Sequence, residues 1–366
     1  MVRFEMMEYS EKVFQKDWVK ENYSSFILGI DIGGTNTNIG IAGVKEKKPT
    51  LLFSHHFDTR FLDSLVPCVN QTLEIAKTNY DIDVHVACVA VAGIVSSDHD
   101  SVDLTNASWK VSKEELLEKT ALTSVDIIND FQAIGYGINL LNIDNNQDVF
   151  QIRSGSREKT KDHPIKVVIG AGTGLGKSIL IYNENAQAYL PIPTEGGHVD
   201  LPIHDEDELA LVEFIRNYRK IDEPLTYEEV LSGRGLEALY AFVRHHNKFS
   251  DTVYTHDIDD ADEKAPLISE YKKMDETCDM TFRLFTRFYG RCAKNIVLDT
   301  LAAGGLYIAG GIAAKNKEIF ISKEFLDEFD RAFRRSEFLR EVPLFVILNY
   351  DISLLGACYA AVINML

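Results

Sequence analysis

The stretch Phe26-Ile-Leu-Gly-Ile-Asp31-Ile-Gly-Gly-Thr-Asn36 decides the fold of this chain. An apolar run ends at an aspartate, passes through two adjacent glycines and continues as a second, β-branched run over residues 38–44. A strand, a tight glycine turn and another strand predict a β-hairpin. Because glycine lets backbone N–H groups approach a ligand closely, such a turn is also able to cradle phosphate oxygens.

The same design returns in the middle of the chain. Residues 166–169 lead into Gly170-Ala-Gly-Thr-Gly-Leu-Gly176, and a β-branched run over residues 178–182 follows. The recurrence of this strand–glycine turn–strand pattern far along the chain indicates two similar halves. A third glycine pair, Gly310-Gly311, comes after the apolar segment 306–309. A hairpin turn explains any one of these clusters, but three of them, two with Thr beside Gly, favour phosphate binding.

The second glycine segment does not fit the two common nucleotide motifs. A Walker A loop needs glycine where Ala171 stands and a helix after the loop, whereas residues 179–182 have the pattern of a strand. The segment also lacks the last glycine of the GxGxxG fingerprint of dinucleotide-binding Rossmann folds. Lys177 is therefore interpreted as an ordinary exposed lysine. Two hairpin phosphate loops instead resemble the actin-like ATPase and sugar-kinase superfamily.

Composition bounds the class of protein. The 366 residues are 45% hydrophobic and 26% charged, which predicts one large or two ordinary globular domains. The net charge of −18 disfavours binding to nucleic acid or anionic membranes, and it requires local attraction for ATP, from backbone amides and Mg²⁺. Five cysteines without a CxxC spacing exclude a disulfide framework and a thiolate zinc site. Without a signal peptide or a membrane-spanning segment, a soluble cytoplasmic protein is expected.

Strands alternate with helices along the chain, which predicts an α/β architecture with mixed sheets. We expect the first 25 residues to form a helical extension and residues 154–164 and 251–264 to form surface loops. Further strands are expected over residues 84–91, 125–128 and 306–309. Helices are expected after the caps Ser112 (with Glu115), Asp205 and Thr226, over 131–141, from about 265 toward 299, and from about 352 to the end.

Seven short segments occur in the order, and at compatible spacings, of one family of sugar kinases. From about Phe26 to Leu366 the chain resembles the bacterial-type glucokinases of the hexokinase superfamily. Each segment alone is a weak signal, but seven in order are a strong one. They are Asp31-Ile-Gly-Gly-Thr-Asn36, Thr105-Asn-Ala-Ser-Trp109, Ile127-Ile-Asn-Asp-Phe131, Gly170-Ala-Gly-Thr-Gly-Leu-Gly176, Glu195-Gly-Gly-His198, Glu229-Val-Leu-Ser-Gly233 and Ala309-Gly-Gly-Ile312.

The resemblance implies a fold and a reaction. The fold is α/β, a two-domain actin-like ATPase (ribonuclease H-like) fold with mixed sheets and an interdomain cleft. Residues 1–25 would be an extension, 26–141 with 352–366 the small domain, and 142–351 the large domain. The reaction is the ATP-dependent phosphorylation of D-glucose on its 6-hydroxyl, which feeds glycolysis. The alternatives are a kinase for another hexose or with another phosphoryl donor, and a non-catalytic nucleotide-binding sensor or scaffold of the same fold.

The resemblance also implies roles for single residues. Asp130 would be the general base that accepts the proton of the sugar hydroxyl, and Asp31 would orient Mg²⁺ through water. The glucose contacts would be Asn106, Asn129, Asp130, Glu195, His198 and Glu229. The ATP contacts would be Gly33, Gly34, Thr35, Asn36, Gly172, Thr173, Gly174, Gly310 and Gly311. A homodimer is the family's expectation. The cysteine-rich zinc motif of related repressor/kinase-family sugar kinases is missing, so no structural zinc is expected.

Local structure offers a competing explanation for three of these positions. Asn129-Asp130 stands between a strand and a helix, where Asn and Asp often serve as N-caps. Thr226-Tyr-Glu-Glu229 has the spacing of a capping box, which would occupy the Glu229 carboxylate. Packing of a helix against a strand accounts for Gly310-Gly311 as well as contact with adenosine does.

Overall fold

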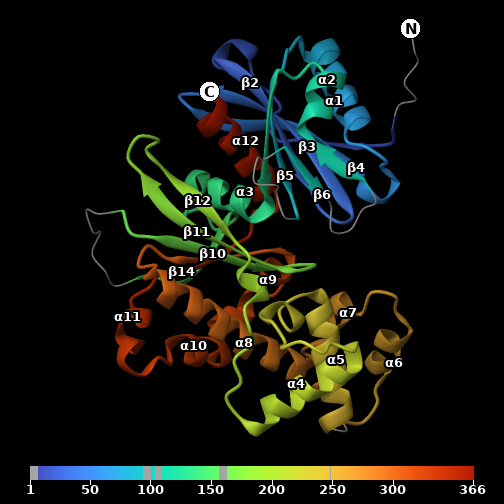
Figure 1. Ribbon diagram of the computed structural model, residues 1–366, viewed down its shortest axis with the longest axis vertical. Helices are drawn as coiled ribbons and strands as arrows, with labels where there is room; N and C mark the ends of the chain where they lie inside the picture. Colours follow the sequence, from blue (N-terminus) through green and yellow to red (C-terminus); the bar gives the residue numbers. More distant parts are fainter. Residues whose placement is uncertain (1–6, 94–99, 104–108, 156–162, 248) are drawn as a thin grey trace. The chain divides into compact units, whose positions relative to one another are not determined.

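A computed structural model describes residues 7–93, 100–103, 109–155, 163–247 and 249–366 (Figure 1). The chain divides into two compact units. Unit 1 comprises Met1–Asn142, Tyr182–Pro193 and Asn349–Leu366, and unit 2 comprises Ile143–Ile181 and Thr194–Leu348. Each unit contains its own buried apolar core, as expected for chains of this length.

Unit 1 is built on a six-stranded mixed sheet of order β1-β4-β3-β2-β5-β8. Strands β1 to β4 pair antiparallel, whereas β2, β5 and β8 run parallel. The strands are β1 Ser10–Val13, β2 Ser25–Ile32, β3 Asn36–Lys45, β4 Lys48–Asp58, β5 Val86–Val91 and β8 Ser124–Asn129; β6 Ser101–Asp103 and β7 Lys110–Ser112 form a separate ribbon.

Helices cover both faces of this sheet (Figure 1). Helices α1 Val66–Tyr80 and α2 Lys113–Lys119 pack on one face, and α3 Asp130–Gly137 and α12 Ile352–Met365 pack on the other. Short 3-10 turns are η1 Lys20–Asn22, η2 Thr59–Phe61 and η3 Ile138–Leu140. The predicted cap is confirmed at Ser112, whose side chain accepts from the Glu115 amide.

The expected helical extension at the N-terminus is wrong. Residues 10–13 form an edge strand, with Ser10 opposite His56 on β4. Trp18 then packs against Tyr80, with their ring centroids 5.5 Å apart. Tertiary structure explains the difference. Without β1, the edge strand β4 would present a row of unpaired backbone N–H and C=O groups, and residues 10–13 satisfy them by pairing as a strand.

Helices α3 and α12 cross with their backbones in close contact. A Cβ atom at Gly356 would lie 1.7 Å from the Ala133 carbonyl oxygen, and one at Gly137 would lie 2.6 Å from the Ile352 carbonyl oxygen. Glycine at both positions lets the two helices approach backbone to backbone, since neither carries a side chain there. Because Asp130 begins α3, this crossing fixes the helix that carries it.

Substitution of Gly356 by alanine is expected to destabilise unit 1 strongly. The new methyl group would meet backbone atoms of α3, which have no rotamer by which to move away. Overpacking of this kind costs about 3 kcal/mol of unfolding free energy. Urea unfolding measures it, with Gly311→Ala as the control, because a Cβ at Gly311 meets nothing within 4 Å. Equal midpoints for the two variants would contradict the close crossing.

Unit 2 is built on the second six-stranded sheet, of order β12-β11-β10-β13-β14-β9. Strands β10, β13 and β14 run parallel, while β11 and β9 pair antiparallel with β10 and β14. The outer part of the β11–β12 hairpin, residues 182–193, is counted with unit 1. The strands are β9 Val149–Arg153, β10 Lys166–Ala171, β11 Leu175–Asn183, β12 Ala188–Thr194, β13 Leu306–Ala309 and β14 Leu344–Ile347.

The helices of unit 2 bury a large apolar core that includes residues of α4, α5 and α8. The longer ones are α4 Glu206–Arg219, α5 Gly233–Asn247, α6 Val253–Asp260, α7 Lys264–Tyr271, α8 Glu276–Thr300 and α10 Lys323–Asp330. The shorter ones are η4 Gly196–His198, η5 Tyr227–Glu229, α9 Gly311–Lys315, η6 Lys317–Ile321, η7 Phe333–Arg335 and α11 Ser336–Arg340.

Two predictions for the helical part need correction. The acidic segment 251–264 is not a loop, because α6 begins there, capped by Thr252 and anchored by the buried Ile258. The single helix expected from about residue 265 is two helices, since Asp275 caps a new one, α8. The Asp205 cap is confirmed, with its carboxylate accepting from the Glu208 amide.

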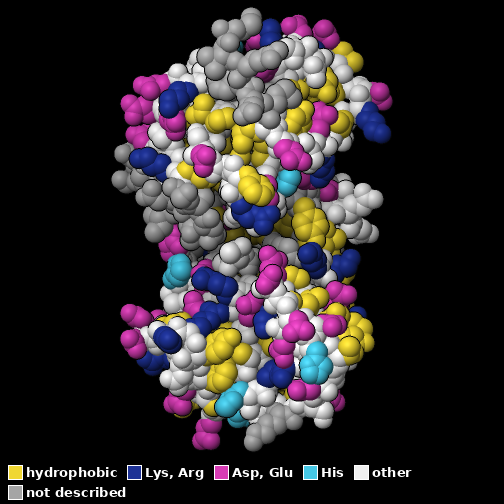
Figure 2. All heavy atoms as spheres, turned by 90° about the vertical axis from the view of Figure 1, so that its right-hand side faces the viewer, with side chains coloured by type: hydrophobic (Ala, Val, Ile, Leu, Met, Phe, Trp, Pro, Cys, Tyr) yellow, Lys and Arg dark blue, Asp and Glu magenta, His cyan; other side chains and the backbone are white. Residues whose placement is uncertain are grey.

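The molecular surface mixes both signs of charge. On the face shown in Figure 2, Asp and Glu side chains are interspersed with Lys and Arg, although the chain as a whole carries −18. Within the described ranges, no helix combines the length and the apolar character that crossing a bilayer requires.

Candidate functional site

In unit 1 the predicted residues gather at one edge of the sheet. Strands β2, β5 and β8 run parallel, with Ile32 opposite Val91 and Val91 opposite Asn129. Their carboxyl ends therefore share an edge, and β2 and β8 lie two strand spacings apart, about 10 Å. The hairpin loop 33–36 and the pair Asn129-Asp130 leave the sheet at this same edge.

Hydrogen bonds fix the conformation of the hairpin loop of unit 1, residues 33–36. The Gly33 amide donates to the Asn36 carbonyl at 2.8 Å. Thr59 makes two hydrogen bonds to the loop. Its amide donates to the Thr35 carbonyl at 2.9 Å, and its hydroxyl donates to the Gly33 carbonyl at 3.1 Å. Gly33, Thr35 and Asn36 are themselves exposed. A fixed, exposed glycine turn of this kind is suited to anionic oxygens.

Asn129 is the N-cap of α3, as the competing explanation required. Its side-chain oxygen accepts from the Phe131 amide at 2.8 Å, and its own amide donates to Gln132 Oε1 at 3.1 Å. Its Nδ2 donates to the Gly93 carbonyl at 3.4 Å. The capping role leaves little of the Asn129 side chain for a sugar.

Asp130 is the first residue of α3 and is half-buried. Its Oδ1 accepts from the Phe131 amide at 2.9 Å. The positive end of the helix dipole favours the ionised carboxylate at this position. Asp130 is thus a carboxylate of defined orientation at the edge that carries the glycine hairpin.

Asp31 is the last polar side chain of β2 before the glycine hairpin. Ser353 of α12 donates to Asp31 Oδ1 at 2.7 Å. Burial raises the pKa of the Asp31 carboxyl; hydrogen bonds from Ser353 and Asn38 act in the opposite direction, and the charge of Asp351 adds a smaller increase. Burial and the neighbouring Asp351 thus destabilise the charged form of Asp31, and a nearby cation would stabilise it. Such a carboxylate fits Mg²⁺, which is bound by one or two carboxylates together with waters and phosphate oxygens.

The glycine loop of unit 2 joins β10 to β11. The Gly172 amide donates to the Gly174 carbonyl at 2.8 Å, and the Gly233 amide donates to the Gly172 carbonyl at 2.8 Å. The Leu175 amide donates to Glu228 Oε2 at 2.9 Å. Thr173 at the tip is exposed. The loop is therefore a second fixed turn that is open to a ligand.

The third glycine pair lies beside this loop, because Gly170 on β10 is opposite Ala309 on β13. Gly310 has φ +96°, and a Cβ there would lie 2.6 Å from the Ala171 carbonyl oxygen. Backbone conformation and packing therefore account for Gly310. Gly311 differs, since a Cβ at that position would meet nothing within 4 Å.

Glu195 and His198 flank the 3-10 turn η4. Both side chains are mostly exposed, and His198 Nε2 lies 3.9 Å from Glu195 Oε2. Between them, Gly197 sits directly on β11, because a Cβ there would be 2.1 Å from the Leu175 carbonyl oxygen. The turn, which follows β12 and rests on β11, thus presents a carboxylate and an imidazole.

The capping box predicted at Thr226 does not form, since η5 has no side-chain cap. The Glu229 carboxylate instead pairs with Arg219, and both side chains are largely covered. Sequence reasoning missed its neighbour Glu228, whose carboxylate lies against Gly174 and is 3.4 Å from Arg234. The signal that could have found it is the pair of consecutive glutamates, of which only one can face the loop.

The predictions for Asn106 and Lys177 have different outcomes. Asn106 lies outside the described residues. Lys177, interpreted from the sequence as exposed, is buried with 5% of its surface accessible, so that prediction is wrong. The reason is strand alternation, because Lys177 shares the inner face of β11 with the buried Leu175.

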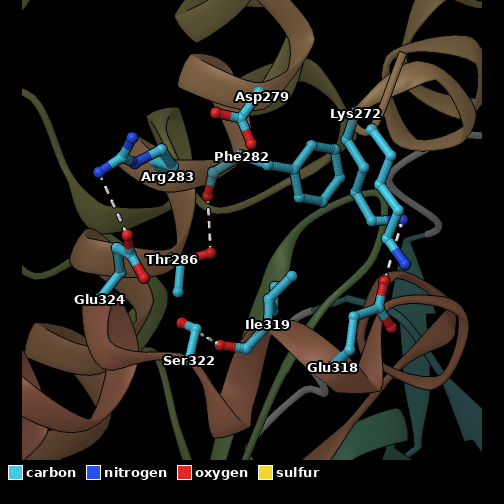
Figure 3. A pocket seen from close by; sticks show the side chains of 10 residues that line it. Lys272, Asp279, Phe282, Arg283, Thr286, Glu318, Ile319, Ser322 and Glu324 are labelled. Atoms are coloured by element: carbon cyan, nitrogen blue, oxygen red, sulfur yellow. Dashed lines mark hydrogen bonds and ion pairs between the residues drawn. The ribbon is translucent and has the colours of Figure 1, made fainter. Parts of the chain in front are cut away.

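A surface groove between α7, α8, η6 and α10 contains none of the predicted residues (Figure 3). Four of its charged groups form two ion pairs: Lys272 lies 3.2 Å from Glu318, and Arg283 lies 3.3 Å from Glu324. A ligand would have to displace these pairs, so the groove is not the candidate site. Across the described segments, no three His, Cys, Asp or Glu side chains are grouped so that they could hold a metal ion by themselves.

The chain is similar to known proteins over nearly its whole length. The family model described as Glucokinase matches residues 28–363. The glucokinase of Trichormus variabilis is 32% identical over 351 residues, which cover 92% of this chain and 99% of the relative. The glucokinase of Synechocystis sp. is 30% identical over 92% of this chain and 98% of the relative.

Solved structures show the same fold. The crystal structure of a glucokinase from an Antarctic psychrotroph aligns with a TM-score of 0.73 at 26% identity over 92% of this chain and 98% of the other. A glucokinase from Balamuthia mandrillaris in complex with glucose aligns with a TM-score of 0.76 at 24% identity over 92% and 93%. The predicted α/β, actin-like ATPase fold with mixed sheets is confirmed. With a family model over nearly its whole length and curated relatives at this identity, the chain belongs to the glucokinase family.

Proposed function

We propose that this chain transfers the γ-phosphoryl group of ATP to the 6-hydroxyl of D-glucose, with Asp130 as the general base. Membership of the glucokinase family supports the reaction. The observation that carries the assignment of the base is the position of Asp130, a half-buried carboxylate at the start of α3, on the sheet edge that also bears the glycine hairpin 33–36.

Phosphorylation of a sugar hydroxyl requires positioned substrates and a group that accepts the hydroxyl proton. Phosphoryl transfer depends mainly on positioning and electrostatic stabilisation, and a hydroxyl nucleophile needs a carboxylate to accept its proton. Asp130 cannot swing freely, because its Oδ1 accepts from the Phe131 amide. Its other oxygen, Oδ2, would accept the proton of the sugar hydroxyl as the phosphorus–oxygen bond forms.

The two glycine loops would hold the phosphates of ATP. Residues 33–36 in unit 1 and 172–174 in unit 2 would donate backbone N–H groups to the phosphate oxygens, and Gly311 would lie against adenosine. A related kinase of this fold, from Streptomyces griseus, has been crystallised with glucose and AMPPNP. Mg²⁺, held near Asp31 through water, would neutralise charge on the phosphates.

The sugar would be bound by Glu195, His198 and Glu228, with Asn106 and the remaining capacity of Asn129. The family resemblance names Glu229 for this role, but its carboxylate is engaged by Arg219. We propose that the adjacent Glu228 makes the contact, because its carboxylate, which accepts from the Leu175 amide and lies 3.4 Å from Arg234, is the one that faces the glycine loop 172–174. Hydroxyl recognition by carboxylates and imidazole gives strong discrimination, because a wrong epimer leaves buried polar groups unpaired.

The remaining expectations rest on the family alone. We propose that residues 26–141 with 352–366 and residues 142–351 act as the small and large domains, that the enzyme is a homodimer and that it works in the cytoplasm. The role of residues 7–25, which add the edge strand β1 to the sheet, is to cover β4.

A coupled assay of glucose 6-phosphate formation tests the function. With ATP and Mg²⁺ we expect turnover of glucose, at least about 100-fold lower kcat/KM for galactose and mannose, and loss of activity in excess EDTA that added Mg²⁺ restores. Full activity in EDTA would rule out the metal. Equal kcat/KM for the three hexoses would favour a broader hexokinase, and nucleotide binding without turnover of any sugar would favour a non-catalytic scaffold.

A further inference from the structure

Lys177 occupies an unusual place for a lysine. It is 5% exposed, on the inner face of β11, three residues beyond the glycine loop 172–174. Within the residues that the structure describes, none of the ion pairs includes Lys177, so its ammonium has no carboxylate partner. Burying an ammonium group without a counter-ion is costly. No step of the proposed reaction uses it.

The side chain lies beneath the first of the two sugar-binding turns. A Cβ at Gly196 would be 2.7 Å from Lys177 Cδ, so the turn that carries Glu195 and His198 rests on the lysine stem. Thr194 reinforces this contact, because its hydroxyl donates to the Lys177 carbonyl at 3.2 Å and accepts from the Gly196 amide at 3.2 Å.

The same side chain supports the second turn. Lys177 Nζ lies 5.0 Å from the centre of the Tyr227 ring, a cation–π distance, and Tyr227 begins the turn that carries Glu228 and Glu229. Tyr227 is itself fixed, since Asn295 Nδ2 donates to its hydroxyl at 2.9 Å. On the side of α8, the ammonium also bonds to the Cys292 thiol; burial raises the pKa of that thiol to about 11, and Lys177 acts in the opposite direction.

We propose that Lys177 is a positioning residue for the sugar subsite. Together with the backbone hydrogen bond from the Tyr227 amide to the Val199 carbonyl (3.0 Å), it fixes the turn 195–198 relative to the turn 227–229. This inference rests on the proposed function. Its buried charge lies against the turns that carry Glu195 and Glu228 in a chain of net charge −18, so it also offsets repulsion between carboxylates that must share one sugar. The glycine loop itself is held by other contacts, from Gly233 and Glu228.

Substitution of Lys177 by methionine tests the proposal. We expect the Kd for glucose, measured by calorimetry without ATP, and the KM for glucose to rise about tenfold or more, with kcat and the KM for ATP within about threefold of wild type. The melting temperature should not fall, because methionine removes a buried charge but keeps the stem. The matched control is Lys294→Met, which removes another buried ammonium, one that donates to the Arg331 carbonyl, and it should leave both affinities unchanged.

A double-mutant cycle provides a second, independent readout. Gly196→Ala alone would press its methyl group on Lys177 Cδ and weaken glucose binding about tenfold, whereas in a Lys177→Ala background the same change should cost less than about threefold. Additive effects, or a Lys177→Met enzyme whose glucose affinity stays within about twofold of wild type, would overturn the proposal. A wild-type chain that binds glucose without phosphorylating it would overturn the proposed function, yet calorimetry would still decide the role of Lys177.

Discussion

Replacement of Asp130 by asparagine is expected to lower kcat for glucose phosphorylation by about 10²–10⁴-fold, the usual contribution of a general base. The KM for glucose should stay within about threefold of wild type. The amide has the shape of the carboxylate, and its oxygen still accepts from the Phe131 amide, so the start of α3 should be preserved. What it lacks is the ability to take a proton from the sugar hydroxyl.

The control for this variant is Asp126→Asn, on the same strand, β8. The Asp126 carboxylate accepts from Asn364 Nδ2 at 2.8 Å, away from the carboxyl end of the strand, and its loss of charge should leave kcat unchanged. Steady-state kinetics with a coupled assay measures both. If Asp130→Asn kept more than about a third of the wild-type kcat, Asp130 would not be the base, and the assignment of the sheet edge would fail with it.

The second large effect is expected at Glu228. Glu228→Gln should lower kcat/KM for glucose about 100-fold or more, because it removes the charge that faces the loop 172–175 and that we propose contacts the sugar. The glutamine oxygen can still accept from the Leu175 amide, so the loop should keep its conformation. The effect should therefore appear in the kinetic constants rather than in the melting temperature.

The adjacent Glu229→Gln is the matched comparison. Its carboxylate pairs with Arg219 in a largely covered position, so its loss should lower the melting temperature and reduce kcat/KM by less than about tenfold. The reverse outcome, a large kinetic loss at Glu229 and a small one at Glu228, would restore the role that the family resemblance gives to Glu229. The two variants together decide which of two consecutive glutamates contacts the sugar.

Much of the candidate site could be predicted from local sequence. A glycine turn between two β-branched runs needs no distant partner, so both hairpin loops are found where the sequence places them. The same holds for Asn129 as a helix cap and for Asp130 at the start of α3, because a cap is made by residues within one helical turn. The order of these motifs was also enough to indicate the family.

Other features could not be predicted, because they depend on residues far apart in the chain. Residues 10–13 form a strand only because β4 offers them a free edge. Glu228 lies at the glycine loop and Glu229 pairs with Arg219 because of where the Leu175 amide and Arg219 lie in the folded chain. A pattern of neighbouring residues carries no information on such pairings.

By itself, the sequence determined the α/β fold, the two glycine hairpins and the acid at the start of α3, since these follow from glycine conformation, strand periodicity and capping over a few residues. The tertiary structure alone decided that Lys177 is buried between Gly196 and Tyr227, because only folding brings β11, η4 and η5 together. Whether a charged side chain faces water or a protein core is settled by what packs over it.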